Sequence, residues 1–349
     1  MPSLDALPVQ YLPLIEERLK LATKSACPSV QTVMDHLWSA RGKRLRPLLC
    51  IASAMCFGDV TDAVLDVACA IELVHAASLV HDDIIDGSRL RRGIPTVNAL
   101  WGGRIAVLTG DVLLARALTI LTPYATVGVM ETVSRAVSRM CESEIEQEQS
   151  AFDTGVSEEQ YLRRIEGKTA ALLEAACLVG ASVSGAPAIL LQHCGHFGRS
   201  LGIAFQIADD ILDFTGDSGD LGKPVCSDLR QGIVTLPAIY LLADCKRGSY
   251  LVETIMRRLV GKRIRRILRD LVDTGALARS AERGIVQLDS AREHLSNLPG
   301  AGARVALGAA LGLIEDRLWG KERERQVLLS LAGGLHAAGR PQSAAEQGH

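Results

Sequence analysis

The segment SLVHDDIIDGSRLRRGIP, residues 78–95, closes an otherwise apolar stretch with three aspartates, and three arginines follow them. The carboxylates of Asp82, Asp83 and Asp86 repel one another at short range. They therefore need either full access to water or a cation held among them. The rest of the chain decides between these two interpretations.

A second segment, FQIADDILDFTGDSGDLGKP at residues 205–224, repeats the D-D-x-x-D pattern with Asp209, Asp210 and Asp213. If both segments are helical, the first and last Asp of each motif face the same way, about 6 Å apart at Cβ. Such carboxylates suit Mg²⁺, which proteins hold through a few carboxylates together with phosphate oxygens and water. A single motif is most often a solvated helix end. Two copies, each beside Lys or Arg, indicate two acidic claws that hold Mg²⁺ and a diphosphate between them.

The elements that must position these claws are helices. In residues 62–86 a stripe at i, i+3 and i+7 steps runs from apolar residues to Asp82. From about residue 8 to 330, apolar residues recur at three- and four-residue spacing, and convincing strand alternation is hard to find. We therefore predict an all-α single domain over residues 1–330, followed by a flexible tail at residues 331–349.

Composition excludes several classes of protein. A net charge of -2 provides no general basic field, so nucleic acid is not expected as a partner. The nine cysteines form no C-x-x-C pair, which argues against a disulfide framework and a cysteine zinc site. His193, Cys194 and His196 lack a second ligand pair at a zinc spacing, so we interpret them as structural. With no signal-like start and no run of about 18 uninterrupted apolar residues, the expected location is cytoplasmic.

Five motifs in order resemble those of the trans-isoprenyl diphosphate (polyprenyl) synthases over roughly residues 10–330. They are GKRLRP at 42–47, ELVHAASLVHDDIIDGSRLRRGIPTVN at 72–98, GD at 110–111, GKTA at 167–170, and FQIADDILDFTGDSGDLGKPVCSDLRQGIVTLP at 205–237. The resemblance implies an isoprenoid-synthase-like helical bundle around a deep central cavity, and a homodimer. One departure is Ile233, which stands where many relatives have lysine.

The resemblance also implies roles for individual residues. The expected ligands of three Mg²⁺ ions that hold the allylic diphosphate are Asp82, Asp83, Asp86, Asp209, Asp210 and Asp213. Arg91, Lys168 and Lys223 resemble further contacts to that diphosphate. The expected pocket for the diphosphate of isopentenyl diphosphate comprises Lys43, Arg46, His75 and Arg92, whereas a role for Arg44 stays open. Thr169 and Gln206 match residues beside the developing carbocation.

The reaction so implied is Mg²⁺-dependent prenyl transfer from an allylic diphosphate to isopentenyl diphosphate, which gives an all-trans polyprenyl diphosphate. Metals and cations that bind the leaving diphosphate lower the barrier to ionisation. A terpene cyclase is less well supported, because its second motif is normally of an N-x-x-x-S/T-x-x-x-E kind. A non-catalytic regulatory subunit would be expected to have eroded claws, whereas both are intact here.

Product length is predicted from the helix that carries the first claw. In this family a bulky aromatic four or five residues before the first Asp blocks the growing chain, but Ala77 and Ser78 stand there. The chain should therefore pass deeper, beyond Val74 and Ile71, to a product of roughly C30 or more. Candidates for the floor of the tunnel are Leu113, Leu114 and Leu118. The alternative is a short-chain synthase that makes farnesyl or geranylgeranyl diphosphate, with another side chain closing the tunnel.

Residues 256–272, MRRLVGKRIRRILRDLV, form a basic amphipathic pattern. Such a helix can contact an anionic membrane, and a transient contact of this kind would suit the release of a lipid product. A solvated face that pairs with nearby acids is the simpler interpretation.

Overall fold

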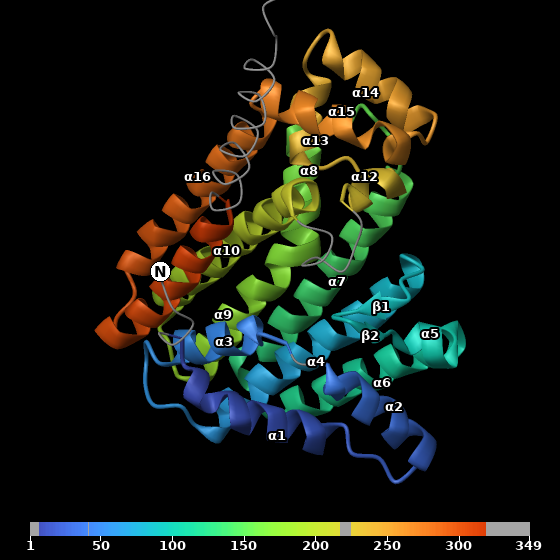
Figure 1. Ribbon diagram of the computed structural model, residues 1–349. Helices are drawn as coiled ribbons and strands as arrows, with labels where there is room; N and C mark the ends of the chain where they lie inside the picture. The colour runs from blue at the N-terminus through green and yellow to red at the C-terminus, as the bar shows by residue number, and fades with distance from the viewer. Residues whose placement is uncertain (1–6, 41, 217–224, 319–349) are drawn as a thin grey trace, which may run out of the picture.

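The computed structural model describes residues 7–40, 42–216 and 225–318, and helices dominate it (Figure 1). The N-terminal half contains α1 (Leu12–Ala22), α2 (Pro28–Ser39), α3 (Leu45–Ala54), α4 (Asp62–Ile85), α5 (Val97–Trp101), α6 (Gly103–Leu121) and α7 (Val129–Gln149). The second half contains α8 (Glu158–Ile165), α9 (Ala171–Val183), α10 (Ala188–Thr215), α12 (Ser227–Gln231), α13 (Leu236–Leu242), α14 (Arg247–Met256), α15 (Val260–Asp273), α16 (Ala276–Ser296) and a helix over residues 301–318. The all-α prediction is confirmed, and the predicted tail at 331–349 lies outside the described residues.

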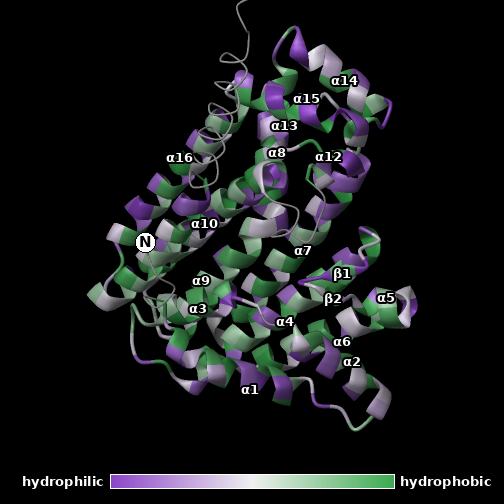
Figure 2. Ribbon diagram, viewed as in Figure 1, coloured by the Kyte–Doolittle hydropathy of each residue, from purple (hydrophilic) through white to green (hydrophobic). Residues whose placement is uncertain are grey.

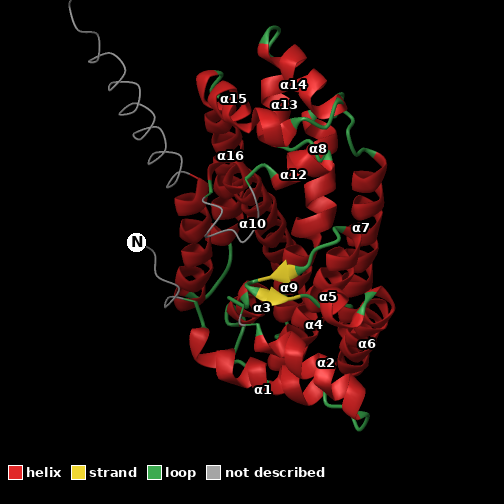
Figure 3. Ribbon diagram, turned by 45° about the vertical axis from the view of Figure 1, so that its right-hand side comes forward, coloured by secondary structure: helices red, strands yellow, loops and turns green. Residues whose placement is uncertain are grey.

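A short hairpin is the feature that the periodicity did not predict. Strands β1 (Leu90–Arg91) and β2 (Ile94–Pro95) pair antiparallel directly after the first claw (Figure 3). The two turn residues, Arg92 and Gly93, have φ of 53° and 81°. Two successive positive φ values match the tight turn that continues the twist of a hairpin. Strands of two residues are too short to leave an alternating pattern in the sequence.

Helix α4 forms the centre of one of the two hydrophobic clusters. It packs against α6, α3 and α9, whose residues are largely hydrophobic (Figure 2). By length and composition alone α4 is one of two helical segments that could cross a membrane, but 72% of its most apolar window is buried inside the protein. The other segment, Gly103–Ala125, has only 33% of its window buried. Helix α6 therefore leaves an apolar side uncovered in the single chain.

Both claws lie where long helices end. Helix α4 ends at Ile85 with Asp86 as its C-cap residue, and Gly87 follows at a φ of 60°. The second claw occupies the last turns of α10, which ends at Thr215. The C-terminal end of a helix carries partial negative charge. Each claw thus adds carboxylates to an end that already disfavours them, which increases the need for a cation.

The GKTA motif forms a π-helical turn, Glu166–Ala170, between α8 and α9. Such single turns, with wider i to i+5 hydrogen bonding, occur often at functional sites. Gly167 permits the turn to press against α7, because a Cβ on this residue would lie 1.8 Å from the Ser143 hydroxyl. Lys168 and Thr169 are the next two residues of this turn, so the packing of Gly167 on α7 positions both of their side chains.

The histidines of the HCGH stretch make contacts that fit the structural role predicted for them. The Nδ1 atoms of His193 and His294 lie 3.1 Å apart, and the ring of His196 stacks on that of His294 at 4.7 Å. Cys194 is buried in the core. These contacts join α10 to α16, whose packing supports the helix of the second claw.

Candidate active site

The first claw separates into two kinds of carboxylate. Asp83 is buried and accepts a hydrogen bond of 2.9 Å from Nε of Arg91, so its charge is balanced within the protein. The carboxylates of Asp82 and Asp86 make no hydrogen bond or ion pair within the described part of the chain. Burial raises the pKa of Asp82 to about 6, although the ammonium group of Lys168 counteracts this. The structure therefore leaves Asp82 with a charge that the protein compensates only partly.

The second claw divides in a different way. Asp210 is buried and accepts hydrogen bonds of 2.7 Å from the hydroxyl of Tyr161 and from Nε2 of Gln206. Asp213 caps α12, because its carboxylate accepts from the backbone N–H groups of Ser227 at 3.0 Å and Asp228 at 3.3 Å. Asp209 pairs with Nη2 of Arg317 at 3.1 Å.

The donor set fits a hard divalent cation, although no preformed chelate exists. Among the residues described, no three His, Cys, Asp or Glu side chains converge on one metal position. The half-buried Asp82, Asp86 and Asp209 nevertheless present carboxylate oxygens from two helix ends. Burial raises the pKa of Asp209 despite the neighbouring Arg317. Carboxylates that are poorly compensated by the protein are the ligands that Mg²⁺ combines with phosphate oxygens and water.

A cationic cluster, comprising Lys43, Arg46 and Arg92, adjoins His75. Nη1 of Arg46 lies 3.0 Å from Nε2 of His75, and since arginine only donates, the imidazole accepts there. Burial and then the charges of Arg46 and Arg92 hold the pKa of His75 well below its usual value. The imidazole is therefore neutral. Nε of Arg46 is buried without a hydrogen-bond partner among the described residues, and an arriving anion could accept from this region.

Arg44 differs from its neighbours. Its buried guanidinium pairs with Glu16 at 2.7 Å and Glu72 at 2.8 Å, and lies 5.3 Å from the centre of the Trp38 ring. These contacts join α1, α2 and α4 at the start of α3. Arg44 thus packs between three helices and also lines the active-site pocket, and a role for it in substrate binding stays open.

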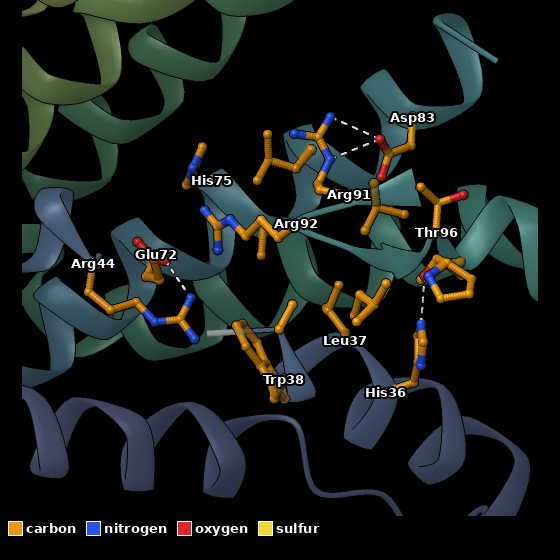
Figure 4. Close-up of a pocket in the computed structure, with 17 residues that line it drawn as sticks. His36, Leu37, Trp38, Arg44, Glu72, His75, Asp83, Arg91, Arg92 and Thr96 are labelled. Carbon is orange, nitrogen blue, oxygen red and sulfur yellow. Dashed lines mark hydrogen bonds and ion pairs between the residues drawn. The ribbon is translucent and has the colours of Figure 1, made fainter. Parts of the chain in front are cut away.

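A pocket joins the arginines of the two expected subsites (Figure 4). The Asp83–Arg91 pair lies at one end, and the side chain of Arg92 extends toward His75 near the Arg44–Glu72 pair. The walls between them are apolar and come from α2, α4 and the segment around β2. They include Leu37, Ala76, Leu79, Val80 and Val97. The hairpin therefore brings both arginines to one cavity, Arg91 from the end of β1 and Arg92 from the turn that follows it.

The residues predicted beside the carbocation form one hydrogen-bonded chain. Oγ1 of Thr169 donates to Oε1 of Gln206 at 2.6 Å, and the amide of Gln206 then donates to Asp210. Lys168 points to α7, where Nζ pairs with Glu144 at 2.7 Å. Lys223 lies outside the described residues.

Sequence reasoning missed Tyr161, Glu144 and Arg317. Tyr161 lies seven residues before Lys168 and resembles an ordinary core aromatic, and its side chain is fully buried. Glu144 belongs to a run of acids on α7 that reads as a solvated face. Arg317 lies 104 residues after the last aspartate of its claw, so its contact with Asp209 left no local signal.

The predicted chain-length residues lie on another face of α4 from the pocket. Ile71, Val74 and Ala77 are buried in the cluster that also contains Leu113, and Leu114 packs against it. Ser78 is half-buried, and its hydroxyl donates to the carbonyl oxygen of His75. None of these residues lines the pocket beside His75. Their role in product length stays a prediction.

Comparison with known proteins identifies the family. A family profile described as polyprenyl synthetase matches residues 27–272, which include both claws. The chain belongs to the polyprenyl synthetase family. It is 38% identical over 306 residues to heptaprenyl diphosphate synthase component 2 of Geobacillus stearothermophilus, covering 87% of this chain and 93% of the relative. This synthase is therefore a trans-polyprenyl prenyltransferase.

Solved structures are similar to the synthase over almost their whole length. A decaprenyl diphosphate synthase from Rhodobacter capsulatus matches with a TM-score of 0.83 and 34% identity, covering 89% of this chain and 97% of that one. A polyprenyl synthase from Caulobacter crescentus, complexed with calcium and isoprenyl diphosphate, matches with a TM-score of 0.84 and 32% identity, covering 90% and 98%. The isoprenoid synthase fold is thus shared with both.

The backbone of Arg92 leads to a first prediction. A non-glycine residue at a φ of 53° is strained, and asparagine tolerates this conformation better than arginine. Arg92→Asn should raise the free energy of unfolding by up to ~1 kcal/mol. The same change should raise KM for isopentenyl diphosphate about tenfold, because it removes a charge-assisted phosphate contact. Denaturant unfolding and steady-state kinetics measure the two effects.

Arg89→Asn is the matched control for Arg92→Asn. Arg89 is exposed on the same segment and has no positive φ, so neither stability nor KM should change appreciably. An unchanged KM in Arg92→Asn would remove Arg92 from the substrate site.

The contact between Tyr161 and Asp210 leads to a second prediction. Tyr161→Phe keeps the buried ring but removes the donor that helps to orient Asp210, and through it Gln206 and Thr169. We expect kcat to fall about tenfold, equivalent to ~1.4 kcal/mol, with little change in either KM. Tyr240→Phe is the control, because Tyr240 donates a similar hydrogen bond of 3.0 Å to Glu158 outside the site. Equal kinetic losses in the two variants would show a general effect on folding instead.

Proposed function

We propose that this synthase extends an allylic diphosphate with isopentenyl diphosphate in repeated Mg²⁺-dependent condensations and releases a long all-trans polyprenyl diphosphate. The observation that carries the proposal is that a group of carboxylates and a group of cations lie next to each other. Partly compensated carboxylates close α4 and α10, and the cationic cluster with its unpartnered Arg46 Nε stands beside them. A substrate that carries phosphate and brings a divalent cation complements both sets at once.

The allylic diphosphate belongs with the claws in this proposal. Asp82, Asp86 and Asp209 would hold Mg²⁺, which would neutralise the charge that develops on the leaving diphosphate. Arg91 is already oriented by Asp83, so its remaining N–H groups can donate to phosphate oxygens. Lys168 would contribute from the π-helical turn, with Glu144 of α7 holding its ammonium group in place.

Isopentenyl diphosphate belongs with the cationic cluster. Arg46 contacts His75 of α4, and its charge also counteracts the raised pKa of Asp209 on α10. Lys43 and Arg92 are exposed and long enough to close on a diphosphate, whereas Arg46 is held by His75. A neutral His75 can donate through Nδ1 while Nε2 accepts from Arg46. This arrangement binds the second substrate without adding a titrating charge to the cluster.

The hydroxyl of Thr169 is oriented by the chain of hydrogen bonds that begins at Asp210. Since its proton is donated to Gln206, the lone pairs of Oγ1 remain available to face electron-poor carbon. Such oriented dipoles stabilise charge that develops during the reaction more effectively than mobile water. No nucleophilic side chain is needed, because the double bond of isopentenyl diphosphate attacks the allylic carbon.

The long product is supported by small residues on α4 and by the names of relatives. Ala77 and Ser78 offer no bulky side chain four or five residues before Asp82. The relatives reported above are named for heptaprenyl and decaprenyl products. A chain that passes two helical turns beyond these positions gains about 11 Å of depth. We therefore favour a product of roughly C30 or more over a short-chain product.

We further propose a homodimer that covers the apolar side of α6. Ile105 and Leu108 are 41% and 59% exposed, and they lie on one stripe with Val112. A contiguous apolar stripe of this kind usually marks an interface. The name of one relative, component 2, raises the alternative that a different subunit occupies this face.

A product-length assay tests the proposed function. Purified protein with Mg²⁺, labelled isopentenyl diphosphate and farnesyl or geranylgeranyl diphosphate should yield products of roughly C30 or more by mass spectrometry. EDTA should abolish turnover. Ala77→Phe should shorten the products to about C15 to C20 with the first condensation little affected, because the added ring blocks the wall of α4.

Ala291→Phe is the control for Ala77→Phe. Ala291 is as deeply buried but belongs to α16 and to the other hydrophobic cluster, so a ring there should not shorten the product. An unchanged product distribution in Ala77→Phe would contradict the long-chain route. A hydrocarbon made without isopentenyl diphosphate would instead indicate a terpene cyclase.

Leu108→Asp tests the dimer. A carboxylate buried at an apolar interface is strongly unfavourable, so light scattering should show a monomer at micromolar concentration where the unmodified chain is a dimer. Leu21→Asp is the control, because Leu21 is 62% exposed on α1, away from α6. A monomeric unmodified chain that becomes active only after a second protein is added would favour the two-component alternative.

A further inference from the structure

Positive charge is concentrated in one small part of the chain. Residues 244–273 contain nine Lys and Arg but four Asp and Glu, whereas the whole chain has a net charge of -2. These residues form the loop that follows α13 and the two helices α14 and α15. The two helices lie together at one end of the molecule (Figure 1). The charge of the protein is therefore distributed unevenly. A negatively charged surface would attract this end of the molecule, so that α14 and α15 face the surface.

The apolar face of α15 is already occupied. Val260, Ile267 and Leu271 are buried, and Ile264 and Leu268 pack against the same cluster. This helix therefore cannot insert its apolar face into a bilayer in the manner of a free amphipathic helix. What it presents to solvent is the opposite stripe of cations.

Only some of these cations are neutralised by neighbours. Glu253 pairs with Arg263 at 3.2 Å, and Asp270 lies 3.6 Å from Arg266. Lys262, Arg265 and Arg269 are exposed, and no carboxylate in the described part of the chain pairs with them. Together with Arg266 they follow i, i+3, i+4 and i+7 spacing, which places them on one side of the helix. We call Lys262, Arg265, Arg266 and Arg269 the basic face.

Neighbouring carboxylates thus neutralise only part of this positive charge. A solvated face whose cations all pair with nearby acids therefore does not account for the basic face. Met256, at the end of α14, is 64% exposed in the same region. Arg258 has a φ of 53° and lies 4.5 Å from the centre of the Phe152 ring, which fixes the corner between α14 and α15. The corner therefore presents cations and one large apolar side chain on a rigid support.

We propose that the basic face is a docking surface for an anionic phospholipid bilayer. The inference rests on the proposed function, because a polyprenyl diphosphate of that length is an amphiphile whose tail gains about 0.8 kcal/mol for each CH₂ group removed from water. Lys262, Arg265 and Arg269, which pair with no described carboxylate, would contribute about 1 kcal/mol each near an anionic surface. Binding is therefore peripheral, reversible and sensitive to salt.

A bilayer fits this surface better than nucleic acid does. Single-stranded nucleic acid is bound by exposed aromatic rings on which bases stack. The one tyrosine in this region, Tyr250, is covered instead, with the guanidinium carbon of Arg266 3.6 Å and that of Arg263 4.8 Å from its ring centre. The active-site pocket and the hollow beside Arg292 both lie away from the basic face. Exposed cations spread along one side of a helix suit a fluid surface of phosphate groups.

The basic face is also connected to the second claw. Asp213 caps the N-terminus of α12, and Arg230 at the other end of α12 lies against the first turn of α15. A Cβ on Gly261 would lie 2.6 Å from Nη1 of Arg230, which shows how close the two helices are. A bilayer at this face would therefore lie near α12, the short helix whose first backbone N–H groups bind Asp213 of the second claw.

Vesicle binding tests the proposal. The full-length protein should sediment with vesicles that contain phosphatidylglycerol and phosphatidylcholine at 0.05 M salt, should be released at 0.5 M salt, and should not bind phosphatidylcholine alone. The triple variant Lys262→Gln, Arg265→Gln, Arg269→Gln should lower binding at least tenfold. The triple variant Lys20→Gln, Lys24→Gln, Arg89→Gln removes three exposed cations elsewhere and should bind as the unmodified chain does.

Turnover provides the second measurement. Phosphatidylglycerol vesicles should raise the steady-state rate of the unmodified chain and of the control variant, but not that of the basic-face variant. All three should perform the first condensation equally in detergent, because none of the altered residues belongs to the site. Vesicle binding that persists in the basic-face variant would overturn the proposal. So would binding to heparin or RNA without binding to vesicles.

The two proposals fail in different ways. If no prenyl transfer occurs in detergent, either with the chain alone or with a second subunit added, the proposed function is wrong whatever the vesicles show. If prenyl transfer in detergent is normal and the protein does not bind anionic vesicles, only the docking surface is wrong.

Discussion

The structure depends on one electrostatic problem, which is the placement of carboxylates at the negative ends of two long helices. Burial raises the pKa of Asp82 and of Asp209, so the fold holds charge that it compensates only partly. Arginine side chains are placed beside these carboxylates. Arg91 balances Asp83, and Arg46 contacts His75 and counteracts the raised pKa of Asp209. The same imbalance that is unfavourable for folding makes the site complementary to a cation and a diphosphate.

The helices that carry this charge are supported by close packing on their apolar sides. Helix α9 approaches α3 so closely that a Cβ on Gly180 would lie 2.1 Å from the carbonyl oxygen of Cys50. Likewise, a Cβ on Gly202 of α10 would lie 2.5 Å from Cα of Ala170, the last residue of the π-helical turn. Contacts of this kind leave little freedom for one helix to move past another. Rigid packing therefore fixes the distance between Thr169, Gln206 and the second claw.

Much of the fold and of the site could be predicted because the signals are local. The all-α class follows from a periodicity that extends over most of the chain, and each D-D-x-x-D motif with its neighbouring cations lies within about twenty residues. The hairpin was missed because two-residue strands have no period. Tyr161 and Arg317 were missed for another reason. Their contacts with Asp210 and Asp209 span 49 and 108 residues, and nothing beside them in the chain indicates that partner.

By itself, the sequence determined that this protein is helical, that it has two carboxylate claws, and that lysines and arginines accompany them, because residue types and spacing carry that information. Tertiary structure alone decided what each charge does. Arg44 and Arg46 are two residues apart, yet one packs between Glu16 and Glu72 while the other faces His75. Asp209 and Asp210 are adjacent, yet only Asp210 is turned into the core toward Tyr161. The physical reason is that the role of a charged side chain depends on its burial and its partners, and distant segments provide both.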